Sequence, residues 1–137
     1  MREYAFEDLD IGTSESFEVE VSAAMLQSFA ELSGDLNPLH TDEAYSQESG
    51  YEGRVVFGML TASFYSRLVG MYLPGKLALF QGIDISFRYP VFVGDRLSVT
   101  GTVDYLNEAY RQVELNSTIR NQKGKIVSKA KIKTGCR

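Results

Sequence analysis

The segment SGDLNPLH at residues 33–40 holds the only histidine of the chain, His40, five residues after Asp35. A carboxylate and an imidazole that share a water molecule can exchange protons with it near neutral pH. Residues five apart on an α-helix lie about 140° from each other around its axis, so a helix would separate the two side chains. Pro38 disfavours such a helix. A tight loop in which Asn37 bonds to nearby backbone could instead turn both side chains toward one point.

The same residues also fit ordinary structural roles. An aspartate after a helix is often only a turn residue, and a histidine before a helix often only caps it. Spacing alone therefore leaves both interpretations open. No second histidine or cysteine accompanies His40, so we expect no metal site. The sequence also lacks a G-x-S-x-G nucleophile elbow and a glycine-rich phosphate loop.

Composition limits the classes of protein that need be considered. With 137 residues, 44% of them apolar, we expect one domain spanning 1–137. No apolar run approaches the ~18 residues of a membrane span, and the start MREYAFEDLD does not resemble a secretory signal. The net charge of −4 argues against non-specific nucleic-acid binding, although a few local cations could hold an anionic ligand. A single cysteine, Cys136, which we expect to be exposed, fits a reducing cytoplasm.

The first half of the chain has the pattern of a strand followed by helices. Residues 15–21 alternate, with Phe17 on the apolar face. A helix is expected from Ser22 as N-cap to Gly34 as C-cap, and a second short helix after a Thr41 cap. Residues 57–73 predict a long helix that is apolar on nearly every side apart from Arg67. Such a helix is normally buried within the protein.

The second half of the chain predicts a sheet. Four segments alternate between apolar and polar residues, and turn signals separate them: 82–90, 96–106, 111–120 and 125–133. Consecutive strands with one apolar face predict an antiparallel sheet that needs a cover. The 57–73 helix needs a surrounding layer. We therefore expect an α+β fold in which a curved antiparallel sheet wraps around one long central helix.

Three segments resemble, in the same order, the MaoC-like, (R)-specific enoyl-CoA hydratases: FAELSGDLNPLHTDEAYSQ, FGMLTASFYSRLVGMYLPGK and ISFRYPVFVGDRLSV. The resemblance covers most of residues 20–105. It implies the hot-dog fold and a hydro-lyase of fatty acid metabolism. The implied reaction is the reversible syn hydration of trans-2-enoyl-CoA to (R)-3-hydroxyacyl-CoA, which needs neither a metal nor a redox cofactor.

The resemblance also implies roles for particular residues. Asp35 and His40 match the catalytic pair that holds and activates the water, and Asn37 matches the loop residue between them. Gly58 matches the glycine whose backbone N–H faces the thioester oxygen. Ser66 matches a helix serine that lines the site. Where relatives usually have His-Gly before the long helix, this chain has a phenylalanine before its glycine.

General physics supports the role of Gly58, because the N-terminus of a helix offers free N–H groups to a developing negative charge. Simple packing roles for Gly58 and for Ser66 also remain open. The resemblance further implies a homodimer, since hot-dog proteins commonly pair their sheet edges about a two-fold axis.

Other functions of the same fold differ in the residue types of the central helix. Hot-dog thioesterases usually draw a carboxylate from the central helix, and residues 57–73 contain neither Asp nor Glu. A non-catalytic module that binds acyl thioesters remains an alternative, as does a dehydratase acting on acyl-carrier-protein substrates. The residue types do not decide between coenzyme A and acyl-carrier protein as the carrier.

Overall fold

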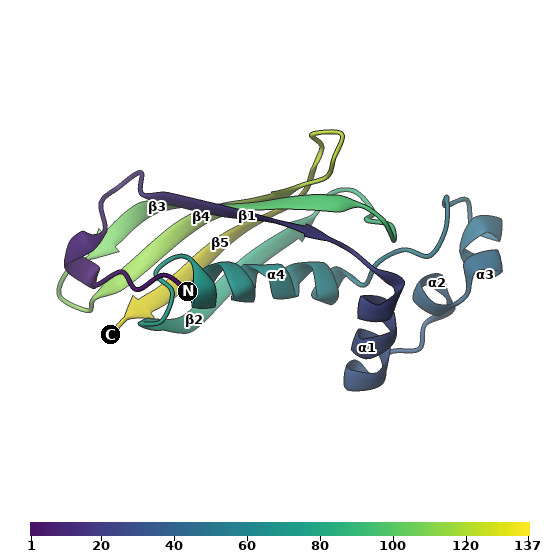
Figure 1. Ribbon diagram of the computed structural model, residues 1–137, viewed down its shortest axis with the longest axis horizontal. Coiled ribbons are helices and arrows are strands. Elements are labelled where there is room, and N and C mark those ends of the chain that lie inside the picture. Colours follow the sequence, from purple (N-terminus) through teal and green to yellow (C-terminus); the bar gives the residue numbers. More distant parts are fainter.

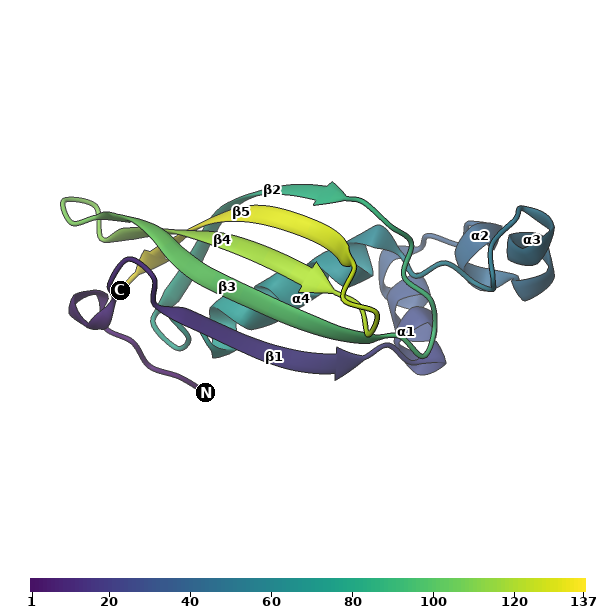
Figure 2. The same cartoon turned by 90° about the horizontal axis from the view of Figure 1, so that it is seen from above.

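The computed structural model describes the whole chain, Met1–Arg137, as a five-stranded antiparallel sheet curved around one long helix (Figures 1 and 2). The central helix is α4 (Gly58–Met71), and a short 3₁₀ helix η1 (Phe6–Asp8) precedes the sheet. The strands lie in the order β1 (Ser14–Glu20), β3 (Arg96–Asn107), β4 (Gln112–Arg120), β5 (Ile126–Cys136) and β2 (Ala78–Phe87). The predicted α+β arrangement is confirmed. No helix is both long and apolar enough to cross a membrane.

The core lies between α4 and the concave face of the sheet. Tyr65, Leu68 and Val69 of α4 are fully buried in the same cluster as Leu115 and Ile119 of β4. Strand alternation sends every second residue of β4 to this face. Each such aliphatic side chain contributes about 1.5–3 kcal/mol to stability by leaving water. The core therefore holds α4 against the concave face of the sheet.

The prediction that α4 is buried on nearly every side is wrong for one face. Six residues of α4 are exposed: Met59, Ser63, Ser66, Arg67, Gly70 and Met71. A single curved sheet covers only the side of the helix that faces it. The opposite side of α4 is therefore left without a cover in the single chain.

The apolar face predicted for residues 82–90 is also only partly covered. β2 starts earlier, at Ala78, ends at Phe87 and forms an edge of the sheet. Ile85 packs against the core, but Ile83 and Phe87 are 39% and 49% exposed. An edge strand has a neighbour on one side only, so its side chains are less enclosed than those of β4.

The alternation of residues 96–106 predicts one apolar face, and a β-bulge changes this face near its end. The residues predicted on it are Leu97, Val99, Val103 and Tyr105. Leu97, Val99 and Val103 are buried as expected, but Tyr105 is 48% exposed. The pairing of β3 with β4 shifts register between Val103 and Tyr105, which reverses the faces of the residues that follow. Leu106 therefore packs against the core in place of Tyr105.

Cys136, predicted to be exposed near the C-terminus, is buried. β5 continues to this residue and pairs it with Ala78 of β2, which draws the thiol into the core. Its Sγ–H donates to the carbonyl of Tyr4 at 3.3 Å. Burial raises the pKa of the Cys136 thiol, so the reactive thiolate form is disfavoured.

The glycine at position 101 is required by the packing of β3 on α4. A Cβ atom on Gly101 would lie 2.7 Å from Cδ2 of Leu68 and 3.2 Å from Oγ of Ser117. We expect Gly101→Ala to lower the free energy of unfolding by about 1–3 kcal/mol, since an overpacked core must shift to relieve the contact. Urea unfolding measures this change. Gly82→Ala is the control, because a Cβ there meets nothing within 4 Å. Equal midpoints for the two variants would contradict the packing argument.

Three short helices lie together at one end of the sheet, opposite the end where the two termini lie (Figures 1 and 2). They are α1 (Ala23–Ser33), α2 (Pro38–Thr41) and α3 (Glu43–Glu48). As predicted, Ser22 caps α1 by accepting from the N–H of Met25, and Gly34 ends it with a φ of 73°. The predicted Thr41 cap is wrong, because Asp42 caps α3 by accepting from the N–H of Tyr45. The loop at 34–37 is thus held between two helices.

Candidate active site

Local hydrogen bonds set the backbone of the loop between α1 and α2. Ser33 donates its hydroxyl to the carbonyl of Phe29 at 2.7 Å and accepts from the N–H of Asp35 at 3.2 Å. Oδ1 of Asp35 accepts from the N–H of Asn37 at 3.1 Å. Asn37 in turn accepts from the N–H of Leu39 at 2.9 Å, which makes it the N-cap of α2. The predicted bond of Asn37 to nearby backbone is confirmed, and this bond explains the residue structurally.

The imidazole of His40 is held by a distant backbone group and by a ring. Its Nδ1 lies 2.6 Å from the carbonyl oxygen of Val55. Because a carbonyl oxygen only accepts, Nδ1 carries the proton, and Nε2 of the neutral ring is left free to accept one. The ring of Phe57, itself only 2% exposed, lies 4.2 Å from the imidazole, measured between ring centroids. Together these contacts fix both the tautomer and the plane of His40.

A groove of about 340 Å³ brings His40 next to the start of α4. Gly58 begins α4, and neither a backbone nor a side-chain acceptor takes up its N–H. The ring of Phe87 lies 3.4 Å from where a Cβ of Gly58 would be, so a larger residue there would touch this ring. The groove is lined by twelve residues: His40, Tyr51, Val55, Val56, Gly58, Thr61, Phe87, Arg88, Tyr89, Pro90, Val91 and Val127.

This groove has the components for one kind of chemistry. It contains one imidazole with a free nitrogen and one unpaired N–H at the positive end of a 14-residue helix. Its other walls are mainly apolar. Such a site can transfer a proton at one point and stabilise a negatively charged oxygen at another. The chain holds no cluster of three or more metal-ligating side chains.

The remaining predicted site residues lie outside this groove in the single chain. Asp35 and Asn37 are exposed on the loop, and the carboxylate of Asp35 accepts from the backbone N–H of Asn37. Ser66 lies on the open face of α4. The structure thus brings His40 and Gly58 together, whereas the site roles of Asp35, Asn37 and Ser66 stay predictions.

Several residues of the groove were not found by sequence reasoning. The carbonyl of Val55 that orients His40 is a backbone group, and no residue type marks it. The alternation of residues 82–90 predicts Phe87 and Tyr89 as members of the apolar face of a strand, and no pattern distinguishes Tyr51 from the other tyrosines. The only available signal was the spacing of Phe87 and Tyr89 at the end of a strand, and that pattern is equally typical of a core face.

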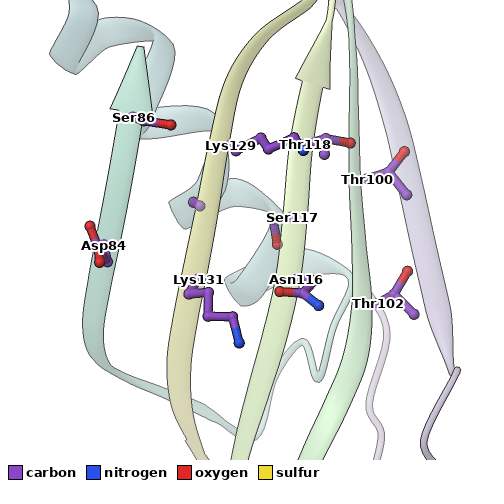
Figure 3. Close-up of a pocket in the computed structure, with 10 residues that line it drawn as sticks. Asp84, Ser86, Thr100, Thr102, Asn116, Ser117, Thr118, Lys129 and Lys131 are labelled. Carbon is purple, nitrogen blue, oxygen red and sulfur yellow. The ribbon is translucent and has the colours of Figure 1, made fainter. Parts of the chain in front are cut away.

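A larger recess, of about 680 Å³, lies on the outer face of the sheet, away from α4 (Figure 3). Its side chains come from β2, β3, β4 and β5 and are mainly hydroxyl, amide and ammonium groups. Asp84 is its only carboxylate, and no histidine or cysteine lines it. This recess therefore lacks an imidazole, and it contains none of the predicted site residues.

Comparison with known proteins agrees on one family. A family model described as "MaoC like domain" matches residues 9–124. The (R)-specific enoyl-CoA hydratase of Aeromonas caviae is 38% identical over 118 residues, which cover 86% of this chain and 88% of that relative. The 3-hydroxybutyryl-CoA dehydratase of Methylorubrum extorquens is 34% identical over 118 residues, which cover 86% of this chain and 75% of that relative. A solved structure of an (R)-hydratase from A. caviae superposes with a TM-score of 0.92 at 34% identity, covering 96% of this chain and 99% of that one.

Proposed function

The chain belongs to the MaoC-like domain family, and from this premise we propose that it is an (R)-specific enoyl-CoA hydratase. The reaction is the reversible addition of water to a trans-2-enoyl-CoA, which gives an (R)-3-hydroxyacyl-CoA. One observation of the structure carries the proposal: an oriented imidazole and a free helix N-terminal N–H, His40 and Gly58, line one groove. A hydratase needs both groups, one for the proton and one for the charge on the thioester oxygen.

The chemistry follows from these groups. The oxygen of water bonds to C3 of the enoyl thioester, one proton of the water goes to the acid–base pair, and one proton is delivered to C2. During the reaction negative charge moves onto the thioester oxygen, which the N–H of Gly58 stabilises by a hydrogen bond. His40 has only Nε2 left for proton exchange, because Nδ1 is bonded to Val55. Asp35 is the second member of the pair that holds the water.

A second copy of the chain would complete this site. The open face of α4 carries Ser63, Ser66 and Gly70, whose small side chains allow another surface to approach closely. The neighbouring edge strand β2 exposes four apolar side chains, Leu79, Phe80, Ile83 and Phe87, together with an unpaired backbone edge. A homodimer formed through β2 would cover both surfaces and would enclose Ser66 near the groove.

We expect sedimentation equilibrium at low micromolar concentration to give about twice the 15.3 kDa chain mass. The reason is that exposed apolar edges of this size are normally paired or covered. A variant with Ile83→Lys should shift the equilibrium toward the monomer, because the charge would be buried without a partner. Asp84→Lys is the control, since its side chain lines the recess on the outer face of the sheet. A fully active monomer of the unchanged protein would contradict the dimer.

Ser66→Leu is expected to lower kcat/KM for long enoyl thioesters more than for crotonyl-CoA. In the proposed dimer the added isobutyl group would occupy space next to the acyl chain. The measurement is the chain-length profile of kcat/KM. If the profile is unchanged, Ser66 is only a small residue of the helix surface.

The proposed function is tested by mixing the protein with crotonyl-CoA and following the loss of the ultraviolet absorbance of the conjugated thioester. Chiral analysis should show the (R)-3-hydroxy product. Hydration without stereochemical preference would contradict the (R)-specific assignment. Binding of crotonyl-CoA without turnover would identify a non-catalytic acyl-thioester-binding module.

A further inference from the structure

The positive charges of this acidic chain are unevenly distributed. Seven of its fourteen Lys and Arg side chains form ion pairs, which leaves seven unpaired. Four of these lie around the turn that joins β4 to β5 and form what we call the hairpin cluster: Arg88, Arg120, Lys123 and Lys125. Arg120 donates to the carbonyl of Gly124 at 3.1 Å, and the N–H of Arg88 donates to the carbonyl of Val127 at 2.8 Å. These bonds tie both arginines to the same hairpin.

The backbone of the hairpin is held in one shape by Asn121. Its Oδ1 accepts from the N–H groups of Lys123 and Lys125 at 3.0 and 3.1 Å. Its own N–H donates to the carbonyl of Lys125, and Gly124 supplies the positive φ of 77° that the turn requires. The ammonium group of Lys125 lies 4.4 Å from the ring centroid of Tyr89. The hairpin cluster is therefore partly ordered before any ligand arrives.

The hairpin cluster adjoins the candidate active site. Arg88 is one of the residues that line the groove of His40 and Gly58. A second recess of about 350 Å³ is lined by Lys123 and Lys125, and it shares Tyr51, Tyr89 and Pro90 with the groove. Figures 1 and 2 show the β4–β5 hairpin at the same end of the sheet as α1. A ligand can thus extend from His40 along shared walls to these cations.

Two carboxylates, Glu52 and Asp95, also line the second recess. Asp95 accepts from the N–H of Phe92 and from the side-chain amide of Gln122, and both of these donors are neutral. Glu52 has no ion-pair partner. The four cations of the hairpin cluster outnumber these two carboxylates, although the whole chain carries a net charge of −4. A local positive potential on an acidic protein favours an anionic ligand at this point.

We propose that the hairpin cluster binds the phosphate groups of coenzyme A while the acyl thioester lies at His40 and Gly58. The proposal rests on the proposed function and assigns the residues that hold the phosphate end of its substrate. Coenzyme A joins its thioester to its phosphates by a flexible pantetheine arm, which can follow the walls shared by the groove and the second recess. Guanidinium and ammonium groups bind phosphate oxygens through charge-assisted hydrogen bonds. The recess beside Lys123 and Lys125 has the volume of a small-molecule site, which favours coenzyme A over a carrier protein.

The test is the binding of butyryl-CoA, a saturated thioester that cannot be hydrated, measured by titration calorimetry. We expect Lys123→Gln with Lys125→Gln to raise the Kd by about tenfold or more, since two phosphate contacts are lost. Butyryl-pantetheine, which has no phosphate, should bind the variant and the unchanged protein equally. Raising the salt concentration should weaken the binding of butyryl-CoA to the unchanged protein more than to the variant. Arg137→Gln is the matched control, because Arg137 is also unpaired but lies at the opposite end of the sheet.

Each outcome decides the proposal. An unchanged Kd for butyryl-CoA in the lysine double variant would overturn it, as would an equal loss of butyryl-pantetheine binding. Failure of the unchanged protein to bind butyryl-CoA would also overturn it. If an acyl-carrier protein then bound in a lysine-dependent way, the cluster would serve that partner instead. Binding of butyryl-CoA by a protein that does not hydrate crotonyl-CoA would refute the proposed function and leave this site intact.

Discussion

His40→Asn is expected to lower kcat for crotonyl-CoA hydration by at least ~10²-fold while leaving the fold unchanged. The Nδ2 of asparagine can occupy the place of the imidazole Nδ1 and donate to the carbonyl of Val55, which keeps the 2.6 Å contact that anchors the loop. The variant has no group in the place of Nε2. Proton exchange with the water is therefore lost, whereas the groove and its apolar walls remain.

His40→Gln provides the comparison for this variant. Its amide lies one carbon further out, so it can replace Nε2 in space but does not reach the carbonyl of Val55 in the same way. Both variants should lose kcat, and only the glutamine variant should also lose stability, by about 0.5–1.5 kcal/mol for the missing hydrogen bond. Urea unfolding separates the two effects. Near-normal turnover by folded His40→Asn would show that Nε2 takes no part in the reaction.

Asp35→Asn should also lower kcat by at least ~10²-fold, because the neutral amide cannot accept a proton. The turn survives this change, since Oδ1 of asparagine can accept from the N–H of Asn37 as the aspartate does. The free energy of unfolding should therefore stay within about 0.5 kcal/mol of the unchanged protein. The measurements are kcat at saturating crotonyl-CoA and urea unfolding of the same preparation.

Asp42→Asn is the matched control for the lost charge. Asp42 caps α3 a few residues along the same segment, and asparagine caps a helix equally well. We expect this variant to keep its kcat. An unchanged kcat for Asp35→Asn would show that Asp35 is only a turn residue. Equal losses in both aspartate variants would point to the general electrostatic field of the segment rather than to one carboxylate.

The double variant Asp35→Asn with His40→Asn tests whether the two residues act as one unit. If both hold the same water, the second change should add little to the first, because residues that work together are strongly non-additive. If the loss of kcat in the double variant equals the product of the two single losses, the two residues have separate roles. This comparison uses the same assay and needs no assumption about which residue is the acid and which the base.

Elements with a local pattern were predictable from residue types. Val113, Leu115 and Ile119 alternate along β4, and all three are fully buried. Ser22 and Gly34 bound α1 because their side chain and backbone satisfy the helix ends within a few residues. These outcomes depend on contacts between near neighbours in the chain, so residue types and spacing were enough to predict them. The resemblance added the family, and with it the residues of the proposed site.

The cover of each element and the contacts across the fold depend on long-range packing. The bulge that exposes Tyr105, the β2 pairing that buries Cys136 and the open face of α4 all depend on which strands adjoin. An apolar pattern gives the face of an element that avoids water, but it does not identify the partner of that face. The same limit holds at the site. His40 owes its tautomer to the carbonyl of Val55, and its position beside Gly58 to the packing of α4 on the sheet. Such long-range contacts form only when the whole chain has folded.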